Sequence, residues 1–139
     1  MKQNKQQAFL LNAPKYLPSE GRPALLRIIF SLENTKVDFA YQTDDYYHKG
    51  GWVHIEPQTF IRFHGEEKKY CLLDAINIPI APIRLDFNTT KDSLYFSLIF
   101  PPIPRNKSKF DLIEKENGEE TDFNYYGISL DEKKLILIL

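Results

Sequence analysis

The clearest alternation of apolar and polar positions runs from Leu94 to Phe100. Every second side chain in this run is large and apolar: Leu94, Phe96, Leu98 and Phe100. A period of two is typical of a β-strand with one buried face. The run Pro101-Pro102-Ile103-Pro104 follows directly. We expect the strand to end there, because proline has no N–H to donate to a sheet.

A second strand is predicted from Leu25 to Leu32, between Pro23 and the polar run Glu33-Asn34-Thr35. The residues expected on its buried face are Leu26, Ile28, Phe30 and Leu32. Val37 to Tyr41 then predicts a neighbouring strand after a short turn. We consider it as an edge strand that a partner could use, because Lys36 and Asp38 are the only charges here that would protect such an edge.

Turn signals divide the rest of the chain into short extended segments. Phe110 to Glu114 and Phe123 to Tyr126 flank Asn117-Gly118, which predicts a hairpin. Thr59 to His64 and Lys69 to Leu73 flank a turn at Gly65 and predict a second hairpin. Gly50-Gly51 marks a turn before the segment Trp52 to Ile55.

Helical spacing is absent from windows of about 11 residues. One helical turn is expected at most, between Ala75 and Ile80, where Pro79 and Pro82 limit its length. We therefore predict an all-β fold, an immunoglobulin-like antiparallel β-sandwich of about seven to nine strands. One domain is expected to span residues 1–139, with a polar lead over residues 1–7. The apolar run Leu135 to Leu139 is expected to pair inside it, or else to form a self-associating edge that makes a homodimer.

Composition narrows the classes of function. The chain has 139 residues, with 18 basic and 19 acidic side chains. This balance provides no positive field for nucleic acid, so no nucleic-acid partner is predicted. The most basic stretch, Arg105 to Lys109, is interpreted as a solvated loop. No apolar run approaches the roughly 20 residues of a membrane helix, so no membrane span is predicted.

The beginning of the chain bears on location. The polar start and the short apolar run Ala8 to Leu11 do not match a signal peptide. A complete chain of this kind is expected in the cytoplasm, and an exported one if a signal peptide has been removed. The single cysteine, Cys71, excludes an internal disulfide and a cysteine-based zinc site.

Several of these segments together resemble a known group of domains. They are the strand ending at Glu33-Asn34-Thr35, the hairpin at Gly65, the run 96–104, the strand 110–114 and the closing run 123–128. The chain is similar here to immunoglobulin-like, telokin-like accessory domains of uncharacterised bacterial proteins. That resemblance covers residues 24–130 and implies an exported or multidomain setting, but it implies no catalytic residues. The missing export signal departs from this pattern.

Candidate catalytic and metal-binding residues are few. His48, His54 and His64 lack the spacing of metal ligands, and only His54 with His64 and Glu56 is considered as a cross-strand site. Cys71 is expected to be a semi-buried core residue. The pairs Asp44-Asp45 and Glu119-Glu120 are expected in solvated turns. With no nucleophile elbow or glycine-rich phosphate loop, we predict no catalytic residue, metal or cofactor.

The most suggestive segment is aromatic. Its candidate binding residues are Tyr41, Tyr46, Tyr47, His48 and Trp52. Aromatic side chains on loops stack on sugars or anchor protein partners. The competing interpretation, which we favour from sequence, makes Trp52 the buried tryptophan of a sandwich. Two functions follow: a non-catalytic accessory module that binds another protein or an adjoining domain, and a carbohydrate or small-ligand binder using this loop.

Overall fold

The computed structural model describes residues 7–12, 23–42, 51–87, 93–107, 109–118 and 122–138. Twelve strands and one short 3-10 helix, η2 (Glu132–Lys134), lie in these ranges. The strands are β1 (Phe9–Asn12), β2 (Ala24–Phe30), β3 (Thr35–Gln42), β4 (Gly51–Val53), β5 (Phe60–Phe63), β6 (Tyr70–Cys71), β7 (Asp74–Ile76), β8 (Leu85–Phe87), β9 (Ser93–Phe100), β10 (Lys109–Ile113), β11 (Tyr125–Ser129) and β12 (Ile136–Leu137).

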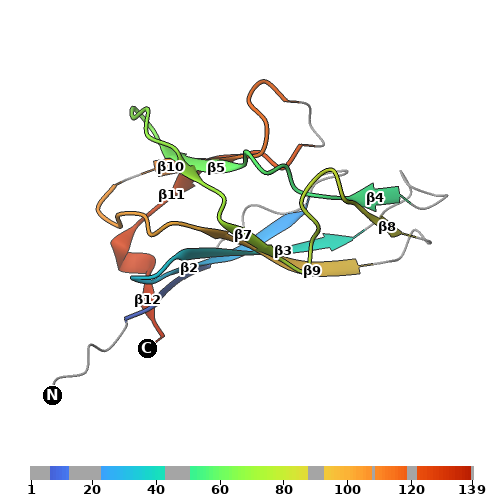
Figure 1. Ribbon diagram of the computed structural model, residues 1–139. Coiled ribbons are helices and arrows are strands. Elements are labelled where there is room, and N and C mark those ends of the chain that lie inside the picture. Colours follow the sequence, from blue (N-terminus) through green and yellow to red (C-terminus); the bar gives the residue numbers. More distant parts are fainter. Residues whose placement is uncertain are drawn as a thin grey trace, which may run out of the picture.

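The strands form three antiparallel sheets. A six-stranded sheet has the order β12-β1-β2-β3-β9-β7, a four-stranded sheet the order β11-β10-β5-β6, and β4 pairs with β8 in a two-stranded ribbon. Figure 1 shows the two larger sheets facing each other, with the ribbon at one end. The prediction of an all-β sandwich is confirmed. The strand number exceeds the predicted seven to nine because several strands are only two or three residues long.

Strands β3 and β9 form the centre of the larger sheet and pair along eight residues. The predicted alternation in β9 is confirmed, since Phe96, Leu98 and Phe100 are buried while Tyr95 is exposed. Leu94, at the start of the strand, is only partly buried. The interpretation of β3 as an edge strand is wrong, because β3 pairs with β2 on one side and β9 on the other.

Strand β2 departs from the predicted face at two positions. Its register with β3 shifts between Leu25 and Arg27, which is the pattern of a β-bulge at Leu26. The extra residue changes the phase of alternation, so Leu25 is buried beside Ile28 and Phe30 while Leu26 is partly exposed. Leu32 is exposed because β2 ends at Phe30 and the chain turns before it.

The core lies between the two large sheets and is rich in aromatic rings. Phe39 of β3 stacks on Phe96 of β9, with ring centroids 5.0 Å apart. It also reaches Tyr125 of β11 in the opposite sheet at 5.5 Å. The Tyr125 hydroxyl donates a 2.6 Å hydrogen bond to the carbonyl of Pro23, which satisfies the polar end of a buried ring.

Both predicted hairpins are confirmed, as β10 pairs with β11 and β5 with β6. The helical turn considered between Ala75 and Ile80 does not form. Its first residues form β7, which pairs with β9. Asn77 then takes a left-handed φ of 64°, and its side chain donates to the carbonyl of Tyr95. No helix in the described part of the chain is both long and apolar enough to cross a membrane.

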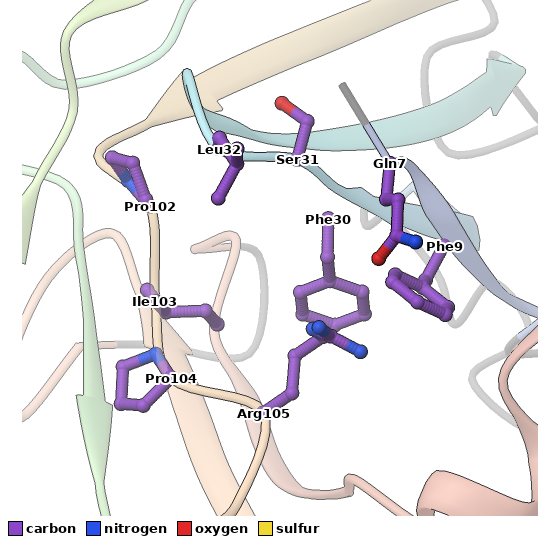
Figure 2. A pocket seen from close by; sticks show the side chains of 9 residues that line it. All are labelled: Gln7, Phe9, Phe30, Ser31, Leu32, Pro102, Ile103, Pro104 and Arg105. Carbon is purple, nitrogen blue, oxygen red and sulfur yellow. The ribbon is translucent and has the colours of Figure 1, made fainter. Parts of the chain in front are cut away.

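The ends of the described chain lie together at the edge of the larger sheet. β12 pairs with β1, so the predicted pairing inside the domain is confirmed for Ile136 and Leu137, while the self-associating edge stays a prediction. β12 is also an outer strand, and Ile136 and Leu137 are about half exposed. At the same end of the sandwich, the proline run after β9 passes the β2–β3 turn (Figure 2). The Thr35 hydroxyl fixes this corner by donating to the carbonyl of Pro101 at 3.0 Å.

Candidate functional site

The candidate site begins with a strand that alternates in polarity. Val53 and Ile55 point into the core and are 3% and 0% exposed. The intervening side chains therefore face outward, because successive residues of an extended chain point to opposite sides. They are Trp52, His54 and Glu56. Trp52 is 46% exposed, so the prediction that it is a buried core tryptophan is wrong.

Backbone pairing brings a second segment alongside. Ile55 donates to the carbonyl of Pro79 and accepts from the N–H of Ala81, at 3.0 and 2.9 Å. The next peptide bond, Ala81–Pro82, is cis. β8 then returns beside β4, with Asp86 opposite Trp52. An open pocket of about 480 Å³ lies between the two segments. We call it the Trp52 pocket; it is lined by Trp52, His54, Glu56, Pro57, Ala81, Pro82 and Arg84.

Two side chains hold the indole ring of Trp52. The His54 ring lies against it, with centroids 4.8 Å apart, and the Arg84 guanidinium carbon lies 5.4 Å from the ring centroid. Arg84 is oriented in turn by an ion pair with Asp86 at 3.2 Å. Arg84 thus lies over a face of the indole ring and the His54 ring is tilted against it, while nearly half of the Trp52 surface still faces solvent.

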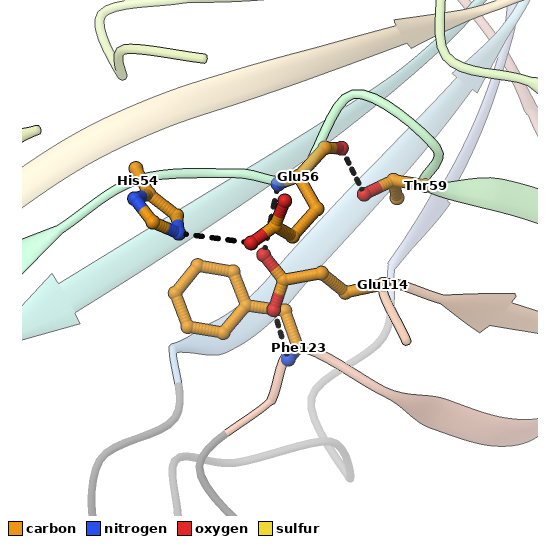
Figure 3. Close-up of polar contacts among 5 residues, drawn as sticks. All are labelled: His54, Glu56, Thr59, Glu114 and Phe123. Carbon is orange, nitrogen blue, oxygen red and sulfur yellow. Dashed lines mark hydrogen bonds and ion pairs between the residues drawn. The ribbon is translucent and has the colours of Figure 1, made fainter. Parts of the chain in front are cut away.

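His54 and Glu56 form the polar wall of the pocket. The His54 Nε2 lies 3.2 Å from a carboxylate oxygen of Glu56 (Figure 3). A carboxylate only accepts hydrogen bonds, so Nε2 of the imidazole is the donor in this contact. The other nitrogen, Nδ1, is buried and has no hydrogen-bond partner among the described residues. His54 therefore serves to hold the Glu56 carboxylate in place.

A buried residue at the end of the neighbouring strand β10 fixes the backbone of Glu56. Glu114 follows β10 and is 4% exposed. One of its carboxylate oxygens accepts from the N–H of Glu56 at 3.1 Å, and the other from the N–H of Phe123 at 2.9 Å. The Glu56 carbonyl accepts from the Thr59 hydroxyl at 2.6 Å. Figure 3 shows these contacts converging on Glu56.

The environment of Glu114 strongly perturbs its titration. Removal from water by burial raises the pKa of its carboxyl from 4.5 to about 7, and the charges of Asp122 and Glu56 add to this rise. The two backbone N–H groups oppose it. A perturbed carboxyl is often a sign of a functional site. Here both oxygens are occupied by the backbone and Glu114 does not line the pocket, so it positions Glu56 and does not meet a ligand.

The arrangement is suited to binding. An aromatic surface, a carboxylate that accepts hydrogen bonds and a guanidinium that donates them face one space. The described lining has no serine, threonine, cysteine or lysine, and its polar side chains are those of Trp52, His54, Glu56 and Arg84.

Of the five candidate binding residues predicted from the sequence, the structure describes Tyr41 and Trp52, and it places them apart. Tyr41 is 3% exposed and packs in the core, 6.4 Å from the Phe123 ring. The prediction that Tyr41 belongs to a binding surface is therefore wrong. Trp52 lines the pocket, while Tyr46, Tyr47 and His48 lie outside the described residues. Sequence reasoning missed Glu56, Arg84 and Glu114 as part of this site. The alternation of polar and apolar residues after Trp52 could have identified Glu56.

Other candidates are placed apart from the pocket. His64 contacts Asp111 at 2.7 Å, whereas His54 contacts Glu56, so the considered cross-strand site does not form. Among the described residues, no three histidine, cysteine or acidic side chains are grouped to hold a metal ion. Cys71 is exposed on the outer strand β6, so its predicted place in the core is wrong. The acidic pairs at 44–45 and 119–120 lie outside the described residues.

No protein-family model, curated protein or solved structure matches this chain.

Proposed function

We propose that this chain is a non-catalytic binding module and that the Trp52 pocket binds carbohydrate. One observation carries the proposal: the chain's single tryptophan is 46% exposed and lines the same pocket as a carboxylate and a guanidinium. Of the two functions that the sequence leaves open, an exposed aromatic surface favours the ligand binder.

The chemistry of the pocket indicates the ligand class. A sugar ring presents C–H groups on its faces, which pack on an aromatic surface, and hydroxyl groups that both donate and accept. Glu56 accepts and Arg84 donates, so each has a partner on a sugar. The opposed charges of Glu56 and Arg84 give the pocket little net charge, which disfavours phosphate and other strongly charged ligands.

The non-catalytic part of the proposal rests on the carboxyl groups. Glycoside hydrolysis uses two carboxyl groups that flank the scissile bond. Glu56 lines the pocket, but Glu114 is buried behind it with both oxygens held by backbone N–H groups. Among the described lining residues a sugar therefore meets one carboxylate, which supports recognition over cleavage.

The immunoglobulin-like, telokin-like character of the sandwich and its accessory role in a bacterial protein are also part of this proposal. Two facing antiparallel sheets with an aromatic core support them. The ribbon of β4 and β8 is a further element beside the two sheets, and it is the element that carries Trp52.

A protein partner is the second candidate, favoured by the opposite edge of the larger sheet. β7 is an outer strand of three residues. Leu73 beside it is 62% exposed and Ile76 at its end is 48% exposed. An outer strand with exposed apolar side chains is a surface on which another chain adds by β-pairing.

Calorimetric titration with soluble hexasaccharides of glucose, xylose, mannose and N-acetylglucosamine tests the proposed function. We expect one of them to bind with a Kd of about 1 mM or below, and Trp52→Ala to weaken it about tenfold or more. Tyr95→Ala is the matched control, because Tyr95 is an exposed aromatic residue outside the pocket. Absence of binding to all four sugars, or equal loss in both variants, would overturn the proposal.

A further inference from the structure

A second cavity lies at the end of the sandwich opposite the Trp52 pocket. It is bounded by the β2–β3 turn, by β1 and by the proline run after β9, and Figure 1 places these segments away from β4 and β8. Its volume is about 330 Å³, within the usual range of small-molecule sites. We call it the Arg105 groove; its main lining residues are Phe9, Phe30, Leu32, Pro102, Ile103 and Arg105.

The groove is apolar in its depth and positive at one side. Phe30 and Ile103 are buried at its base, and Leu32 is 72% exposed at its rim (Figure 2). Arg105 is the single charged residue among the described lining residues. An exposed leucine beside a cavity floored by aromatic and branched side chains leaves apolar surface available to a ligand.

Arg105 differs from the other arginines that the structure describes. Arg27, Arg62 and Arg84 each form an ion pair with a carboxylate. The guanidinium of Arg105 instead lies 3.8 Å from the ring centroid of Phe9, and no ion pair with a described carboxylate is found. Lys107, two residues on, is paired with Glu66 at 3.0 Å. The unpaired charge therefore faces an apolar cavity, where a carboxylate is its natural partner.

We propose that the Arg105 groove binds a medium-chain fatty acid, with the acyl chain over Phe30 and Ile103 and the carboxylate on Arg105. Charge complementarity selects an anion, and the apolar floor selects a ligand with a hydrocarbon body. A peptide is less suited to this space because its amides need hydrogen-bond partners. Pro102 and Pro104 have no N–H to offer them, whereas an acyl chain needs none.

Chemical-shift titration of the ¹⁵N-labelled full chain tests this site with sodium octanoate, octan-1-ol and N-acetyl-leucyl-isoleucine. We expect octanoate to shift the resonances of Phe9, Leu32 and Ile103 saturably. Arg105→Gln is expected to weaken octanoate about tenfold, because a charge-assisted hydrogen bond is lost, and to leave the binding of octan-1-ol unchanged. Arg62→Gln, which removes the same charge outside the groove, is the control and should bind octanoate like the parent.

Leu32→Asp provides an independent variant, since an exposed position tolerates the change while the rim of the groove loses its apolar surface. It should also weaken octanoate. No saturable shift with octanoate, or equal affinity of the parent and Arg105→Gln, would overturn the proposal. Tighter binding of the acetylated dipeptide than of octanoate would also overturn it, in favour of a peptide carboxyl terminus.

Discussion

The carboxylate of Glu114 accepts a hydrogen bond from the backbone N–H of Glu56 at 3.1 Å, across 58 residues of sequence. This contact joins the end of β10 to the wall of the Trp52 pocket. The Glu114 side chain also holds the backbone of Phe123, so a single buried group connects three segments. The pocket therefore depends on a residue that does not line it.

The ionisation of Glu114 predicts a pH dependence of stability. Its pKa is about 7 in the folded chain, above the ordinary value of 4.5. Between these values the folded state binds more protons than the unfolded state, so stability falls as the pH rises. Glu114 therefore contributes about 3 kcal/mol to the free energy of unfolding below pH 4.5, and this contribution is lost by about pH 7.

The variant Glu114→Gln isolates this effect. The NH2 group of the glutamine amide points a donor at one of the two backbone N–H groups. This mismatch lowers the free energy of unfolding by a similar amount at every pH. Relative to the variant, the parent should therefore lose about 3 kcal/mol between pH 4.5 and pH 8. Urea unfolding of both chains across this range measures the difference. Parallel stability curves would show that Glu114 keeps an ordinary pKa.

Truncating two adjacent residues of β9 should change stability by very different amounts. Phe96 is 3% exposed in the core, whereas Tyr95 is 68% exposed. Phe96→Ala is expected to lower the free energy of unfolding by about 3–5 kcal/mol through lost burial and the cavity left behind. Tyr95→Ala should stay within about 0.5 kcal/mol of the parent. Denaturant unfolding checks both, and similar losses in the two variants would contradict the assigned faces.

The single thiol offers a test of the smaller sheet. Because Cys71 is exposed on the outer strand β6, an aromatic disulfide reagent should modify it in the folded chain at a rate of the same order as in denaturant. Cys71→Ser should give no signal, since the chain has one cysteine. Strong protection of the native thiol would place β6 in the interior, contrary to the structure.

The outer strand β12 should contribute only modestly to stability. It pairs with β1 at two positions, and its side chains are about half exposed. Deleting residues 136–139 removes a few hydrogen bonds and is expected to lower stability by about 1–3 kcal/mol, while β1 stays paired with β2. Denaturant unfolding measures the loss and sedimentation the oligomeric state. Failure of the shortened chain to fold, or loss of a dimer with unchanged stability, would contradict this role.

Local pattern predicts much of the fold and little of the site. The period of two in Leu94 to Phe100 identifies β9 and its buried face, since both are properties of one strand. The bulge at Leu26 is invisible to such a pattern because it arises from pairing with β3. Residue type alone predicts a buried Trp52, although Val53 and Ile55 already occupy the inward positions.

The remaining parts of the site come from distant sequence. Arg84 reaches Trp52 through the pairing of β8 with β4, and Glu114 reaches Glu56 because β10 pairs with β5, the strand that follows Glu56. Periodicity reports which face of a strand is buried but not which strands meet. Without a motif of fixed spacing, these contacts follow only from the assembled fold.

The fluorescence of Trp52 tests the central claim most directly. The chain has one tryptophan, so its emission reports on the pocket without a background from other indoles. Titration with the hexasaccharide that binds in calorimetry should change this emission saturably, with the same Kd, and Glu56→Gln should move the midpoint to higher concentration. Calorimetric binding without any change in emission would show that the sugar binds away from Trp52, and would contradict the account.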